Sequence, residues 1–180
     1  YTIAYDDSVL PQDFPRERLR ASVMNNSILK KLFYPKLFFL DPVLFELFNF
    51  NDYDVVISSS TRFAKSVVTQ PQTKHVAYIN SPPRFLWPVS KGFTPEDYAE
   101  GFISKVFFLF RPLVRMILPF LLSWLRLQDY SAGQRADVVI GNSHNVSQRI
   151  QKFYQREASV IYPFVELERF KPEEPSQVAS

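Results

Sequence analysis

Short apolar runs recur along the chain and predict five β-strands. Several of these runs do not alternate between apolar and polar residues. A continuous apolar run is typical of a strand that is buried on both faces, as in a parallel sheet covered by helices. The five predicted strands span residues 1–5, 54–59, 75–80, 137–142 and 158–162.

The segments between these runs have helical character. Helices are expected in residues 29–33, 37–50 and 61–68 and after the fourth predicted strand. Pro35 and Pro42 are expected to interrupt the first two, because proline lacks a backbone N–H. Val146, Ile150 and Phe153 follow the i, i+4, i+7 spacing of a buried helix face. This alternation predicts an α/β fold, an open parallel sheet with helices on both faces.

Two of the predicted strands lead into similar sequences. Residues 54–60 and 137–143 share an Asp at the start, a Val-Val-Ile core and a polar exit that ends in Ser. The exit residues are all good helix N-caps: Ser59, Ser60, Asn142 and Ser143. Ligands of open parallel sheets bind beyond the carboxyl ends of the strands, where helix N-termini suit phosphate. With a third polar exit at 80–84, these residues predict a phosphate-binding crevice; capping alone explains each residue taken singly.

Residues 102–125 form the most hydrophobic segment and also carry basic residues. The longest uncharged run has ten residues, 116–125, whereas a membrane-spanning helix needs about 20. On a helical wheel Arg111, Arg115 and Arg126 share one sector, with Lys105 at its edge. The apolar residues point elsewhere: Phe107, Phe110, Ile117, Phe120, Leu121 and Trp124. This pattern predicts a helix lying in a membrane interface; the alternative is a helix packed on its own sheet.

Two prolines interrupt this segment. Pro112 and Pro119 are expected to break or kink the helix, so that it forms two or three shorter pieces.

Composition narrows the possible chemistry. The 180 residues include no Cys, two His and four Gly. Disulfides, thiolate sites and multi-histidine metal clusters are therefore excluded, and neither a dinucleotide-binding nor a P-loop glycine pattern is present. The formal net charge of +3 conceals two basic blocks, residues 16–36 and 102–135. Such blocks, rich in Phe and Leu, favour an anionic partner surface or are solvated faces.

Five motifs in order resemble a known family. They are DYDVVISSSTRFAK (52–65), VAYINSPPRFLW (76–87), LRLQD with SAGQRADVVIGNS (125–143), VSQRIQKFY (146–154) and VIYPFVELERFKP (160–172). Together they are similar to glycosyltransferases of family 4, which have the GT-B fold, and most of all to bacterial mannosyltransferases of polysaccharide and O-antigen synthesis. The resemblance covers nearly the whole chain.

The resemblance implies a domain arrangement. Residues 1–162 correspond to the Rossmann-like N-terminal domain, on the acceptor side, without the family's first strand, and a groove is then expected in the sheet. Residues 163–180 correspond to the linker towards a C-terminal domain that is absent here. In the family that domain binds most of the donor, a sugar nucleotide such as GDP-mannose. No cofactor or metal is expected.

The resemblance also implies partners and a location. The expected function is transfer of a hexosyl, most often mannosyl, group with retention to a lipid-linked or polysaccharide acceptor. The expected partners are a lipid-linked saccharide, the cytoplasmic membrane surface and the missing domain. The expected location is the cytoplasm, peripheral to the inner membrane. Nucleic acid is not expected, because no recognised module pattern is present.

One position departs from the family pattern. The family reads His-Thr-Pro where this chain has Asn80-Ser81-Pro82. An Asn side chain forms hydrogen bonds but does not transfer a proton at neutral pH. In a retaining transferase the leaving phosphate can accept the proton of the acceptor. A non-catalytic Rossmann-like module that binds an anionic membrane or a partner protein therefore stays as the alternative.

Seven residues are candidates for substrate binding, each with a structural alternative: Ser60, Lys65, Asn80, Arg84, Trp87, Asn142 and Ser143. Arg84 follows two prolines and is suited to pair with a phosphate of a lipid diphosphate or a nucleotide. Trp87 either stacks on a sugar ring or packs in the core. Lys65 lies one helical turn from Thr61 and is expected to reach the same crevice. The catalytic residue is not identified from the sequence.

Overall fold

The computed structural model describes residues 1–26, 28, 38–87 and 111–165, and the side chains of residues 111–115 are not among the described atoms. Several sequence predictions lie outside the described residues: the helix at 29–33, Lys105, Phe107, Phe110, the side chains of Arg111 and Arg115, and the linker beyond residue 165.

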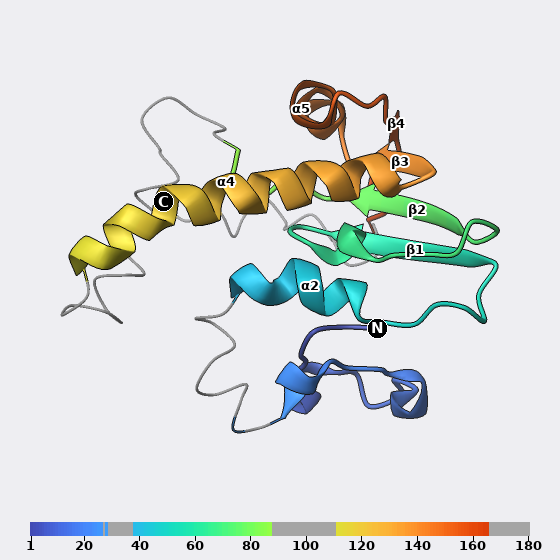
Figure 1. The fold of residues 1–180 in the computed structure, drawn as a ribbon. Helices are drawn as coiled ribbons and strands as arrows, with labels where there is room; N and C mark the ends of the chain where they lie inside the picture. Colours follow the sequence, from blue (N-terminus) through green and yellow to red (C-terminus); the bar gives the residue numbers. More distant parts are fainter. Residues whose placement is uncertain (27, 29–37, 88–110, 166–180) are drawn as a thin grey trace, which may run out of the picture.

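A four-stranded parallel sheet forms the centre of the molecule (Figure 1). Its strands lie side by side in chain order, β1 to β4, and every neighbouring pair is parallel. Their bounds are β1 Val55–Ser60, β2 Lys74–Ile79, β3 Val138–Gly141 and β4 Ser159–Val160. The prediction that residues 54–59, 75–80 and 137–142 are adjacent strands running the same way is confirmed. The chain is an α/β protein.

The predicted strand at residues 1–5 is wrong. Within this segment Thr2 makes an isolated parallel bridge to Ala21, and it does not join the main sheet. The rest of the described N-terminal segment holds three short 3-10 helices, η1 Asp7–Val9, η2 Arg16–Arg18 and η3 Val23–Asn25. Ile3 and Met24 of this segment are buried, and the ring of Tyr1 contacts those of Phe48 and Phe50.

The helices before β2 differ from the prediction. Helix α2 spans Asp41–Glu46 and is preceded by the 3-10 helix η4, Phe38–Leu40. Pro42 does not interrupt this helix but lies in its first turn, where no N–H is needed. Residues 61–68 hold only the 3-10 helix η5, Ala64–Ser66. Ser59 and Ser60 therefore cap no helix.

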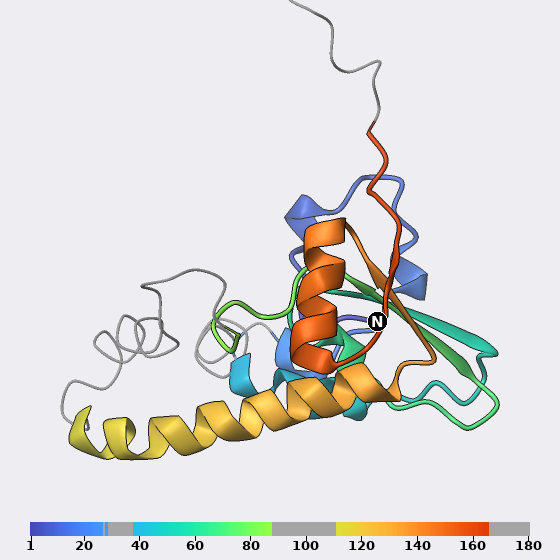
Figure 2. The same cartoon turned by 90° about the horizontal axis from the view of Figure 1, so that it is seen from above.

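Helix α4, Arg111–Arg135, is a single element of 25 residues. The predicted break at Pro119 is wrong, because Pro119 lies inside the continuous helix. Pro112 lies in the first turn of α4, and residues 102–110 are outside the described part of the chain. Every third or fourth side chain of its second half is buried: Leu122, Leu125, Asp129 and Ala132. This packing holds the helix together despite the hydrogen bond that Pro119 removes. The first turns of α4 extend well beyond the sheet (Figure 2).

The described helices cover one face of the sheet. Ala77, Ile79 and Val139 pack against helix α5, His144–Tyr154, and against the end of α4. Val56 packs with Phe50 and Val67 in a second cluster. The opposite face stays open in the described part of the chain, where Val55, Ile57 and Val138 are 53%, 72% and 45% exposed. Helices were predicted on both faces of the sheet. In the described part of the chain they cover one face.

Candidate functional site

The carboxyl ends of the strands meet at one edge of the sheet. Ser60, Ile79, Gly141 and Val160 lie at the same level in the register. The ladder continues one residue further, because Asn80 N–H donates to Ser60 O (2.9 Å) and Asn142 N–H donates to Ile79 O (3.3 Å). The polar exits predicted from the sequence therefore leave the sheet side by side. We call this the exit edge.

Three of the predicted residues take part in side-chain pairs at the exit edge. Asn80 Nδ2 donates to Ser59 Oγ (3.2 Å), so the first two strand exits are linked. Ser143 Oγ accepts the N–H of Val146 (3.3 Å) and donates to Asn142 Oδ1 (3.2 Å). Ser143 is the N-cap of α5, as predicted. The half-buried side chains of Asn80, Asn142 and Ser143 thus remain reachable from solvent.

Two arginines, Arg84 and Arg149, belong to the loop after β2 or contact it. Arg84 is exposed in the loop after β2. Arg149 of α5 reaches the same loop, where its Nη1 donates to Ser81 Oγ (2.9 Å) and its Nη2 to Pro82 O (3.0 Å). Burial, and next the positive charge of Arg84, lower the pKa of Arg149.

Lys65 lies in the interior and not at the exit edge. Its ammonium forms an ion pair with Asp129 of α4 and donates to Arg62 O (2.8 Å), and both charged side chains are almost completely buried. The ammonium also lies 5.2 Å from the ring centroid of Tyr154. The prediction that Lys65 reaches the ligand crevice is therefore wrong. Because the Lys65 ammonium is buried, the carboxylate of Asp129 is needed to compensate its charge.

Trp87 belongs to the same buried network. Its Nε1–H donates to Asp129 Oδ2 (2.6 Å), and the hydroxyl of Tyr154 donates to the same oxygen (2.8 Å). The indole also stacks on Phe153, with ring centroids 5.1 Å apart. Burial and the neighbouring carboxylate of Asp129 raise the pKa of Tyr154, which stays protonated as a donor. Of the two roles expected for Trp87, its contacts are those of the core.

The remaining predicted residue of β1 is also internal. Ser60 is 1% exposed, and its hydroxyl donates to Arg62 O (3.0 Å). His75, which the sequence places at the start of a strand, is buried and its Nε2 lies 2.8 Å from Ser58 Oγ. Burial lowers the pKa of His75 to about 4, so the ring is neutral near pH 7. Both residues serve the core.

The predicted membrane-facing side chains divide between the core and the solvent. Trp124 packs against a core cluster that includes Phe63 and Leu86. Arg126 Nε donates to Leu86 O (2.9 Å), so its head is held against the protein body. Three other residues of α4 are more exposed and lie along one stripe of the helix: Met116 (63%), Phe120 (75%) and Leu127 (64%). Trp124 and Arg126 are therefore corrected to body-facing residues.

Two functional candidates were missed in the sequence although each carries a signal. Asp129 is a charged residue at a helix position that is otherwise apolar, between Leu125 and Ala132. Such a placement predicts a buried partner. Arg149 lies within the i, i+3, i+4, i+7 set that starts at Val146, and a core-facing arginine likewise predicts a specific acceptor.

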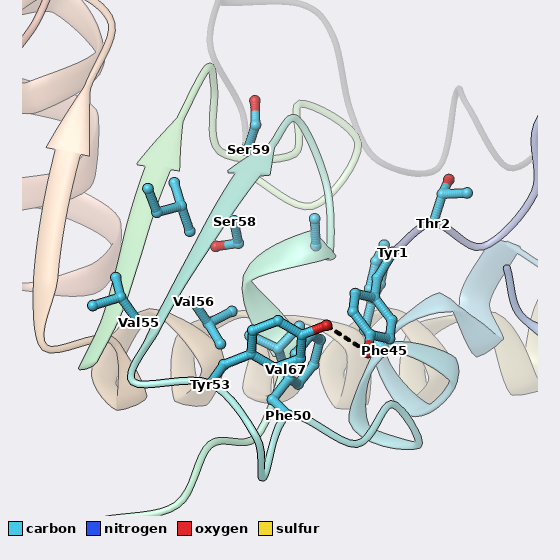
Figure 3. Close-up of a pocket in the computed structure, with 12 residues that line it drawn as sticks. Tyr1, Thr2, Phe45, Phe50, Tyr53, Val55, Val56, Ser58, Ser59 and Val67 are labelled. Atoms are coloured by element: carbon cyan, nitrogen blue, oxygen red, sulfur yellow. Dashed lines mark hydrogen bonds between the residues drawn. The ribbon is translucent and has the colours of Figure 1, made fainter. Parts of the chain in front are cut away.

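A pocket of about 480 Å³ lies along the free edge of β1 (Figure 3). Aromatic side chains form much of its wall, among them Tyr1, Phe50 and Tyr53. The hydroxyls of Tyr1 and Tyr53 lie 3.4 Å apart, as the dashed line shows. None of the seven substrate-binding candidates lines this pocket. Ser59, which accepts from Asn80 at the exit edge, is among the lining residues, so the pocket borders the exit edge.

The described residues contain no cluster of three or more His, Asp or Glu side chains suited to hold a metal ion. Within the same residues, every helix is too short or too polar to cross a bilayer.

Comparison with known proteins adds no relative. The chain matches no protein-family model, no curated protein and no solved structure. Inference about the function therefore rests on the geometry of the exit edge.

Proposed function

We propose that residues 1–162 form the acceptor-side, Rossmann-like domain of a retaining glycosyltransferase with the GT-B fold. The observation that carries the proposal is the exit edge, where Asn80, Asn142, Ser143 and Arg84 follow neighbouring parallel strands. Ligands of open parallel sheets bind at this edge. The ordered family motifs described above supply the reaction class, which is transfer of a hexosyl group from a sugar nucleotide to a lipid-linked saccharide.

The side chains that follow the strands at the exit edge suit binding. Asn80 offers an amide in place of a titratable group. His75 lies at the opposite, amino end of β2, where it is buried and its Nε2 is engaged by Ser58, whereas His144 is the first residue of α5 beside Ser143. The role proposed for this domain is therefore to bind and orient the acceptor. The donor sugar nucleotide, such as GDP-mannose, is assigned to a second domain.

The pocket along β1 also supports the proposal. It separates the free edge of β1 from Tyr1 and Thr2. The resemblance to the family predicts a groove in the sheet.

The test compares acceptor with donor. Isothermal titration of the chain with a short-chain polyprenyl-diphosphate saccharide and with GDP-mannose is expected to show saturable binding of the first and at least tenfold weaker binding of the second. The chain alone is expected to give no transfer product, because catalysis requires both substrates to be positioned together. Absence of acceptor binding would refute the proposal, and so would turnover by the chain alone.

A further inference from the structure

The two arginines at the exit edge are Arg84 and Arg149. Neither forms an ion pair with a carboxylate in the described part of the chain. Arg149 uses two of the five N–H donors of a guanidinium for Ser81 and Pro82. Its Nε is buried and has no acceptor. A buried donor without a partner is uncommon and often marks the place of an unseen water or ion.

The Arg149 side chain and the backbone that leads to Arg84 are also held in place. The backbone of Arg84 follows two buried prolines, whose φ angles are fixed by their rings. Arg149 is anchored at both terminal nitrogens to the Ser81–Pro82 segment, which leads directly to Arg84. Arg84 is the second residue after Pro82, so both cations are tied to the same short loop, and arginine forks match phosphate oxygens. The arrangement is therefore prepared for an anionic ligand.

We infer that Arg84 and Arg149 form a clamp for a diphosphate group at the exit edge. Each guanidinium takes one phosphate of the pair, and the backbone of the loop after β2 sets their spacing. The inference deepens the proposed function, on which it rests for the identity of the ligand: the diphosphate is that of the polyprenyl-linked acceptor. The same chemistry occurs in a nucleoside diphosphate, and the experiment separates the two sources.

The first measurement uses inorganic pyrophosphate. Isothermal titration of the 180-residue chain is expected to show saturable binding at one site, which weakens as salt is added. Arg84→Gln is expected to weaken binding at least tenfold, the loss of about one charge-assisted hydrogen bond. Arg84 is exposed, so this variant retains the fold. Arg18→Gln is the matched control, because it removes an equally exposed arginine from η2 and is expected to change affinity less than twofold.

The second variant tests the anchored partner. Arg149→Gln is expected to weaken pyrophosphate binding to the same extent as Arg84→Gln. If this variant does not fold, Arg84→Gln with its control still decides the matter. No saturable binding, or equal weakening by Arg84→Gln and Arg18→Gln, would overturn the clamp.

The last measurement identifies the source of the diphosphate. Farnesyl diphosphate and GDP are titrated in separate experiments against the wild-type chain and Arg84→Gln. Tighter binding of farnesyl diphosphate, lost in the variant, is the expected result and supports both the clamp and the acceptor role. Tighter binding of GDP, lost in the variant, keeps the clamp but refutes the proposed acceptor role. Binding of both ligands that the variant does not weaken refutes the clamp alone.

Discussion

At the scale of single residues, the interior is organised around the carboxylate of Asp129. It has 0% exposure and accepts from the side chains of Lys65, Trp87 and Tyr154. Side chains of α4, α5, η5 and the loop after β2 thus contact one another at the Asp129 carboxylate. A buried carboxylate with one cation and two neutral donors is satisfied only while all the partners are present.

Loss of the cation from this network is expected to be costly. Lys65→Met leaves the Asp129 charge without compensation, and breaking a buried pair in this way costs about 3–5 kcal/mol. Urea unfolding measures the free energy of unfolding. Lys152→Met, which removes an exposed lysine of α5, is the control and is expected to change stability by less than about 0.5 kcal/mol. A loss below about 1 kcal/mol in Lys65→Met would show that the pair is not a stabilising unit.

His75 and Asp41 are expected to give opposite dependences of stability on pH. Burial lowers the pKa of His75 from 6.5 to about 4, so only the unfolded chain takes up this proton between these values and stability is lost as pH falls. Burial raises the pKa of Asp41 from 3.8 to about 6. The folded chain then holds the extra proton, and stability is lost as pH rises through this window.

Single variants separate the two effects. In His75→Gln the slope that remains is that of Asp41, so the free energy of unfolding is expected to decrease from pH 4 to pH 6. In Asp41→Asn the slope of His75 remains, and the free energy of unfolding is expected to increase over the same range. Urea unfolding at half-unit pH steps provides the measurement, and slopes of the same sign in both variants would disprove the assignment.

At the scale of elements, tertiary packing overrides local sequence signals for where a helix begins or breaks. Pro119 predicted a break in α4, yet its neighbours Leu118, Leu121 and Leu122 pack with the core cluster around Phe63, and the helix continues. Ser60 predicted a helix start, but its hydroxyl is used by Arg62 and the chain forms only η5. Local propensity is a weak prior that tertiary contacts override.

The strand order and the Ser143 cap were predictable because apolar runs and N-cap residues depend on the chain nearby. The network of Lys65 was not, because Asp129 is 64 residues away in the sequence. The open face of the sheet was not predictable either, since its apolar residues, such as Ile57, have the composition of a covered face.

Helix α5 approaches β3 so closely that a side chain at Gly141 would require a shift of a few tenths of an ångström. A Cβ built there lies 3.1 Å from the backbone N of Ser147, and backbone cannot turn aside. Gly141→Ala is expected to shift α5 and destabilise the chain by about 1–3 kcal/mol, the usual cost of overpacking. Because Arg149 moves with α5, pyrophosphate binding is expected to weaken as well. Unchanged thermal stability together with unchanged binding would show that α5 is not fixed by this contact.

At the scale of the whole molecule, α4 presents an apolar stripe away from the body. Met116, Phe120 and Leu127 are all more than half exposed, on a helix that projects beyond the sheet (Figure 2). An exposed apolar stripe of this kind is suited to a membrane interface, and the sequence predicts that Lys105, Arg111 and Arg115 face anionic lipid. We propose that the chain binds the membrane surface peripherally through this stripe.

Liposome flotation tests this surface. Phe120→Ser is expected to reduce the fraction of chain bound to vesicles with anionic lipid several-fold, because it removes most of the exposed aromatic area of the stripe. Leu47→Ser, which changes an equally exposed apolar residue just after α2, is the control and is expected to bind as the wild type does. Equal binding by Phe120→Ser and the wild type, or binding that ignores anionic lipid content, would exclude a membrane role for the stripe.

The position of Trp87 provides an optical readout of the exit edge. The chain has only two tryptophans, and Trp87 directly follows the loop that holds Arg84, with its indole bound to Asp129 and stacked on Phe153. Indole emission responds to nearby charge and to the order of the ring. In a Trp124→Phe background, a single fluorophore then reports every rearrangement of that loop. Ligands for the exit edge can be screened by intrinsic fluorescence alone, without a label or a coupled assay.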